Sequence, residues 1–89
     1  MLAAAKQLPN GERRKQPLRI CVQSSLELYF MDLDGHPPEG IYDMVIGEVE
    51  QAMLESVMLH VRGNQTRAAE ALGMNRSTLR KKLKQYRLL

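Results

Sequence analysis

Basic side chains near the C-terminus are the residues of this sequence best suited to binding a polyanion. From Arg62 to the end of the chain, eight basic residues are opposed by one acid, Glu70. From Pro17 to Val61 the balance reverses, and eight acidic residues stand against Arg19 alone. A basic patch with an acidic body behind it would orient a protein on DNA, because phosphates attract the patch and repel the body.

These basic residues coincide with a pattern typical of a helix-turn-helix. Asn64 can cap a short helix over residues 65–72 through its side-chain oxygen. Gly73 can then adopt the positive φ of a tight turn, and Asn75 can cap a second helix over residues 76–86. A short helix, a turn with glycine and a second short helix predict a DNA-binding motif of this type.

The second helix of the motif has an apolar side and a polar side. Its apolar residues recur at i, i+4 and i+7 and are expected to face inward: Leu79, Leu83 and Tyr86. The start of a recognition helix reaches base edges. We therefore expect Arg76 to read guanine through O6 and N7, with Asn75 and Lys81 as its neighbours on the bases.

Other polar residues of the motif are placed to hold the DNA backbone. Asn64, Thr66 and Arg67 stand at the start of the first helix, where the helix dipole and free amide hydrogens favour an anion. The alternative for the basic run over residues 80–84 is a solvated helix end suited to its dipole. We favour DNA contact because the run belongs to a complete motif, and we expect these further contacts: Ser77, Thr78, Arg80, Lys82 and Lys84.

Two longer helices must carry this motif. Apolar residues at helical spacing predict a helix from Leu18 to Leu33 that closes at Asp34-Gly35, followed by a proline-containing loop at residues 36–40. Residues 41–61 contain no proline and predict one long helix. Its apolar surface is wider than one short helix can cover. We therefore expect the two helices to meet their symmetry mates in a four-helix core from two chains.

The size of the chain also favours a dimer. A core built from 89 residues is marginal, and Cys21 is the single cysteine, so neither an internal disulfide nor a zinc-binding thiolate cluster can stabilise it. A partner subunit is the stabiliser that remains. Because Cys21 lies in an apolar stretch with no histidine nearby in sequence, we interpret it as a core residue rather than a nucleophile.

We divide the chain into a flexible N-terminal arm at residues 1–16, dimerisation helices at 17–61 and a helix-turn-helix region at 62–89. An Asn10-Gly11 hairpin is the alternative for the arm. No secretory signal or membrane-spanning run is recognisable, so we expect a cytoplasmic protein with no membrane contact. Two isolated histidines and one thiol assemble no catalytic set, and we expect no enzyme, cofactor or metal site.

The sequence resembles the Fis family of bacterial nucleoid-associated DNA-binding proteins. The resemblance rests chiefly on Arg62-Gly-Asn-Gln-Thr-Arg-Ala-Ala, Gly73-Met-Asn-Arg and Thr78-Leu-Arg-Lys-Lys-Leu-Lys. It runs from Gln16 to Tyr86, and it also includes Pro17-Leu-Arg, Tyr29-Phe30, Leu33-Asp-Gly35 and Glu48-Val-Glu-Gln.

The resemblance implies an all-α, intertwined homodimer of four helices per subunit that acts as a global transcriptional regulator in the nucleoid. Its two recognition helices would lie too close for straight DNA, so it would bend degenerate palindromes with outer guanines and an A/T-rich centre. RNA polymerase or a recombinase would be a further partner. Carried over by position, the guanine reader is Arg76, its neighbour is Asn75, and the surrounding contacts are Asn64, Thr66, Thr78, Arg80, Lys81 and Lys82.

The sequence departs from this family pattern at three places. Ser77 stands where relatives have glycine, which could alter the fit to DNA. Ala52 replaces a proline in the long helix, so the kink that proline would cause is expected to be weaker. Residues 1–15 match the family's arm poorly, and we do not carry stimulation of recombination over to this chain.

Two other functions fit parts of the sequence. The same motif closes enhancer-binding transcriptional activators, but the start at Met1 and the lack of a phosphate-binding glycine-rich loop favour a free-standing protein. In a protein-interaction module that binds no DNA, the acidic helices would be the working surface. Loss of DNA binding on changing Arg76 would argue against that alternative.

Overall fold

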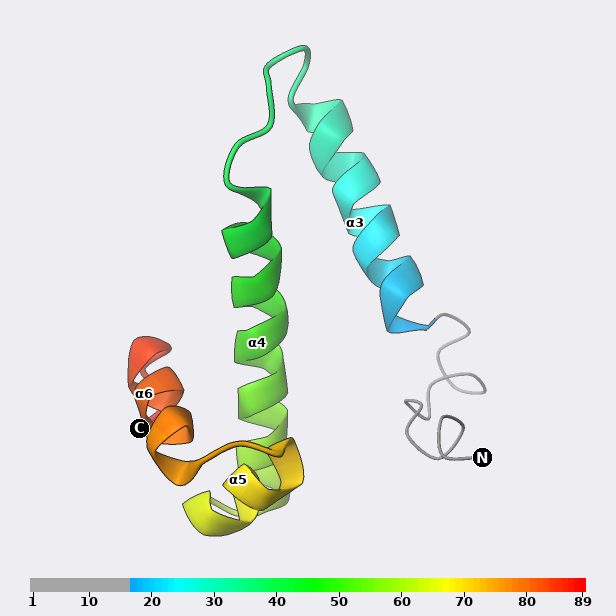
Figure 1. The fold of residues 1–89 in the computed structure, drawn as a ribbon. Coiled ribbons are helices and arrows are strands. Elements are labelled where there is room, and N and C mark those ends of the chain that lie inside the picture. The colour runs from blue at the N-terminus through cyan, green and yellow to red at the C-terminus, as the bar shows by residue number, and fades with distance from the viewer. Residues whose placement is uncertain (1–16) are drawn as a thin grey trace. The chain divides into compact units, whose positions relative to one another are not determined.

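The computed structural model describes residues 17–89, which form four helices and no strand (Figure 1). Each helix begins at the residue expected from the sequence, and the all-α prediction is confirmed. The arm expected at residues 1–16, with its alternative Asn10-Gly11 hairpin, lies outside the described residues. The helices are α3 (Leu18–Asp32), α4 (Ile41–His60), α5 (Gln65–Leu72) and α6 (Arg76–Gln85).

The chain divides into two compact units, Met1–Ile41 and Tyr42–Leu89. In the first unit, Pro17 precedes α3 in an extended conformation. The helix closes as predicted, because Asp34 and Gly35 both have positive φ, 51° and 89°. No residue of α3 is buried. The prediction that Cys21 fills a core is therefore wrong for this single chain, in which Cys21 is exposed.

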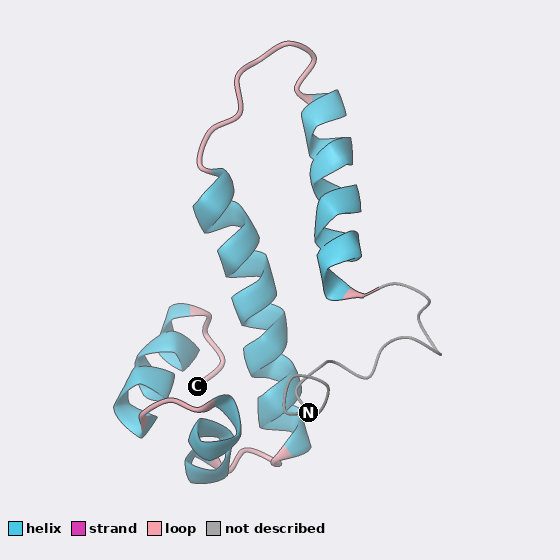
Figure 2. Ribbon diagram, turned by 45° about the vertical axis from the view of Figure 1, so that its right-hand side comes forward, coloured by secondary structure: helices cyan, strands magenta, loops and turns pink. Residues whose placement is uncertain are grey.

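The second unit contains α4 and the two short helices, which lie beside the C-terminal half of α4 in both ribbon views (Figures 1 and 2). The long helix runs without interruption through Ala52. It ends at His60, and the predicted glycine lies in the turn that follows: Gly63 has a φ of 81°, and its N–H donates to the Met58 carbonyl at 2.9 Å. Arg62 also has positive φ, so the chain turns sharply before α5 begins.

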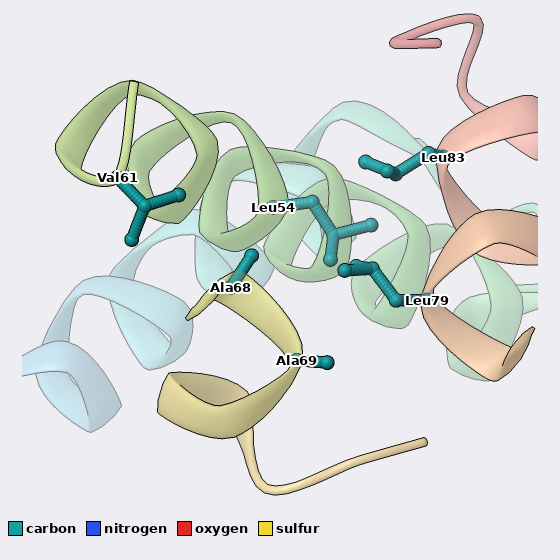
Figure 3. Packing of buried hydrophobic residues seen from close by; sticks show 6 residues of the cluster. All are labelled: Leu54, Val61, Ala68, Ala69, Leu79 and Leu83. Carbon is teal, nitrogen blue, oxygen red and sulfur yellow. The ribbon is translucent and has the colours of Figure 1, made fainter. Parts of the chain in front are cut away.

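Leu54 of α4 is the centre of the core in the second unit. It is fully buried, and it points toward Leu79 and Leu83 of α6, which are also fully buried (Figure 3). Ala68 and Ala69 of α5 belong to the same cluster, where their small side chains suit the close packing of α5 against α6. This cluster holds the two short helices on the long one.

Most of the apolar surface of α4 stays exposed. Leu54 is the one buried residue of this helix, whereas Tyr42 is 75% exposed and Leu59 is 81% exposed. Within the second unit, α5 and α6 cover the part of this stripe around Leu54. Helix α4 shares this core with the helix-turn-helix. The expected boundary between a dimerisation region and a DNA-binding region at residues 61 and 62 remains a prediction.

Candidate nucleic-acid interface

The first helix of the motif is built as the sequence predicted. Asn64 is extended, and its Oδ1 accepts a hydrogen bond from the Arg67 backbone N–H at 3.1 Å. At the other end, Gly73 is left-handed with a φ of 76°, and its N–H donates to the Ala69 carbonyl at 2.9 Å. The predicted cap at Asn64 and the predicted glycine turn are both confirmed.

The cap predicted at Asn75 is only half correct. Asn75 has the extended backbone of an N-cap, and its carbonyl accepts the Leu79 N–H at 3.0 Å. Its side chain makes no cap hydrogen bond, because the extended backbone and its carbonyl are enough to begin the helix. The exposed Asn75 amide therefore remains available to an external partner.

Helix α6 separates its apolar and polar residues as expected. Leu79 and Leu83 are fully buried, and Tyr86 is half-buried against the same cluster. Ten of the eleven residues predicted to contact DNA are exposed on the two short helices and at their caps. They are Asn64, Thr66, Arg67, Asn75, Arg76, Ser77, Thr78, Arg80, Lys81 and Lys84.

Arg80 joins the two helices of the motif. Its Nη1 donates to Gln65 Oε1 at 2.9 Å, so it links the middle of α6 to the first residue of α5. The sequence analysis assigned no role to Gln65, because a contact between residues 15 positions apart depends on how the two helices pack. The bond holds the Arg80 guanidinium against the start of α5, where an anion would be favoured.

Lys82 is the predicted site residue that the structure places differently. Its side chain is 31% exposed, and its Nζ forms an ion pair with Glu50 Oε2 of α4 at 2.7 Å. The other carboxylate oxygen, Oε1, accepts a hydrogen bond from the Tyr86 hydroxyl at 2.7 Å. No local pattern indicates this role of Glu50, since 36 residues separate it from Tyr86.

The electrostatics of this cluster follow from its contacts. The hydrogen bond from Lys82 lowers the pKa of the Glu50 carboxyl, and the bond from Tyr86 lowers it further, against the opposing effect of burial. The pKa of Tyr86 is raised, chiefly because its hydroxyl donates to that carboxylate. Glu50 is therefore held in its charged form at neutral pH.

Two kinds of site are not found among residues 17–89. These residues contain no group of three or more side chains suited to holding a metal ion. None of their helices combines the length and apolar character needed to cross a lipid bilayer.

Comparison with known proteins identifies the family. Residues 45–86 match the model described as "Bacterial regulatory protein, Fis family", and residues 3–38 match "DNA-binding protein Fis N-terminal domain". The chain is 58% identical over 74 residues to a "Putative Fis-like DNA-binding protein" of Pseudomonas aeruginosa, covering 83% of this chain and 71% of the relative. The chain belongs to the Fis family. It is also 55% identical over 73 residues to "DNA-binding protein Fis" of Buchnera aphidicola, covering 81% of this chain and 74% of the relative.

Membership of the Fis family confirms the resemblance seen in the sequence and corrects its extent. The family consists of bacterial DNA-binding regulators, so the prediction that the chain is not an enzyme is also confirmed. The N-terminal model matches from residue 3, so the expectation that the resemblance begins at Gln16 is wrong. The arm also carries the family pattern.

Proposed function

We propose that this Fis-family protein is a homodimer that binds and bends A/T-centred, degenerate palindromic DNA and acts as a global transcriptional regulator. The observation that carries the proposal is the polar surface of α5 and α6. Ten exposed side chains suited to bases and phosphates lie on a two-helix motif whose opposite side is anchored to α4 by buried leucines. The names of the relatives, which include "DNA-binding protein Fis", support the DNA-binding part of the proposal.

Base reading is assigned to the start of α6. Arg76 is the first residue of the helix and is exposed, and the Asn75 side chain beside it is not used as a cap. A guanidinium at this place can donate two hydrogen bonds to one guanine. Lys81 lies farther along the same helix and would contact the neighbouring bases or backbone.

Backbone contacts are assigned to the rest of the exposed polar set. Thr66 and Arg67 lie in the first turn of α5, where amide hydrogens and the helix dipole attract a phosphate. On α6, phosphate contacts come from Ser77, Thr78, Arg80 and Lys84. Asn64 can contribute its amide hydrogens, because its cap uses the side-chain oxygen alone.

A second copy of the chain is the proposed cover for the apolar surface of α4. Tyr42, Ile46, Met53 and Leu59 are exposed large apolar residues of this helix, and a chain of this size gains stability by burying them. Two copies would present two recognition helices to successive major grooves, as a palindromic site requires. DNA whose central minor groove compresses easily would bend to meet both helices.

The cellular setting follows from DNA binding. A regulator of this kind acts in the cytoplasm on the nucleoid, and RNA polymerase or a recombinase is a further proposed partner. Matching of residues 3–38 to the Fis N-terminal domain favours a Fis protein over the DNA-binding end of an enhancer-binding activator.

Binding of wild type and Arg76→Ala to an A/T-centred palindrome and to random DNA tests the proposal. Across a salt series, wild type is expected to form a bent complex with two subunits, and Arg76→Ala to lose about 1 to 3 kcal/mol of discrimination at the guanine. Arg19→Ala on α3 removes the same charge outside the motif and should keep the discrimination. Failure of wild type to bind at low salt, or equal discrimination by Arg76→Ala, would refute the proposal.

A further inference from the structure

Glu50 is a partly buried carboxylate that links the long helix to the recognition helix. Its side chain is 16% exposed, and its two oxygens are used by Lys82 of α6 and by Tyr86, the C-cap residue of that helix. Oε1 accepts from the Tyr86 hydroxyl, and Oε2 pairs with the Lys82 ammonium, each at 2.7 Å. These short distances are those of charge-assisted hydrogen bonds, which are stronger and more demanding in geometry than neutral ones.

The apolar contacts beneath α6 and its polar contacts restrain it in different ways. Leu79 and Leu83 pack on Leu54, and such contacts are non-directional, whereas hydrogen bonds are directional. Hydrogen bonds to one carboxylate from positions 82 and 86 restrain both rotation about the helix axis and sliding along it. Arg76 is at the opposite end of the same helix. A rotation or shift of α6 that follows loss of the Tyr86 hydrogen bond would therefore also move Arg76.

We propose that Glu50 is a positioning residue for DNA reading, which fixes the recognition helix on α4 through Tyr86 and Lys82. The inference rests on the proposed function. Since α4 also carries the apolar surface assigned to the second copy, Glu50 connects the dimer core to the start of each recognition helix. It would set the distance between the two guanine-reading arginines.

This positioning role can be separated from the charge of Glu50. A carboxylate near DNA weakens binding to every sequence, because it repels phosphates. Removing that charge alone would strengthen specific and non-specific binding by the same factor. Loss of positioning lowers only specific binding, so the ratio of the two affinities is the decisive measurement.

The experiment compares the full chain with Glu50→Ala and Tyr86→Phe on an A/T-centred palindrome with outer guanines and on random DNA of equal length. Tyr86→Phe is expected to lower the specific to non-specific ratio by about fivefold, the change that one lost hydrogen bond would produce, and Glu50→Ala, which also removes the ion pair with Lys82, is expected to lower it by at least as much. They should also tolerate altered spacing between the two guanines. Glu48→Ala is the matched control, since it removes the same charge from an exposed position of α4 and should keep the ratio.

The outcomes distinguish this inference from the proposed function. If wild type discriminates and Arg76→Ala does not, but folded Glu50→Ala and Tyr86→Phe both keep the wild-type ratio, the positioning role is refuted and the proposed function stands. If Glu50→Ala does not fold, Tyr86→Phe alone decides, because it retains the aromatic ring in the core and removes only the hydroxyl. If wild type does not discriminate, both proposals fail.

Discussion

Replacing Leu54 with alanine is expected to loosen both short helices from α4 at once. Leu54 is fully buried and contacts the cluster formed by Leu79 and Leu83 of α6 and Ala68 of α5 (Figure 3). The substitution removes the isobutyl group beyond Cβ and leaves a cavity where three helices meet. The cost depends on how far the partly buried side chains packed against the cluster, such as Leu72 and Met74, can move into this space.

The expected loss is about 2 to 5 kcal/mol in the free energy of unfolding, the range for fully buried leucines replaced by alanine. A chain of this length is expected to have a total stability of roughly 4 to 13 kcal/mol. The variant should therefore lose a large share of its stability, and it should release α5 and α6 before it loses the helical content of α4.

Urea denaturation followed by circular dichroism, at one fixed protein concentration, measures this effect, since the stability of a dimer depends on concentration. Leu54→Met is the control, because it nearly conserves volume and should cost less than about 1.5 kcal/mol. A loss below about 1 kcal/mol for Leu54→Ala, or equal losses for the two variants, would refute the assignment of Leu54 as the centre of the core.

Three further predictions concern the caps, the turn and the partly buried Glu50 carboxylate. Asn64→Ala should lower the free energy of unfolding by about 1 kcal/mol through the lost cap. Asn75→Ala should weaken DNA binding and leave stability unchanged. Equal losses of thermal stability in the two variants would contradict this prediction. Gly73→Ala should cost about 1 to 2 kcal/mol from its positive φ alone, because no atom lies within 4 Å of the added Cβ, and Gly73→Asn should cost less in the same denaturation assay. Because the pKa of Glu50 is lowered in the folded protein, the charged carboxylate contributes stability above the ordinary pKa of 4.5, and this contribution is lost as pH falls through the lower folded pKa. Glu50→Gln should therefore flatten the acid limb of the pH–stability curve. An unchanged acid limb would disprove the contribution.

Local signals account for the features that the sequence predicted correctly. The Asn64 cap joins residues three positions apart, and the Gly73 turn requires one backbone conformation that glycine adopts readily. Such signals act within one helical turn and do not depend on how helices pack. The starts of all four helices, the polar side of α6 and the family resemblance follow from them.

The placement of Lys82 was decided by tertiary structure alone. Its sequence position is equally compatible with a phosphate contact and with an ion pair, and only the packing of α6 on α4 brings Glu50 within 2.7 Å. The same holds for the bond from Arg80 to Gln65. The helical pattern defines which side of a helix is apolar, but partners distant in the chain are chosen by the angle between helices and by side-chain rotamers, which no local signal specifies.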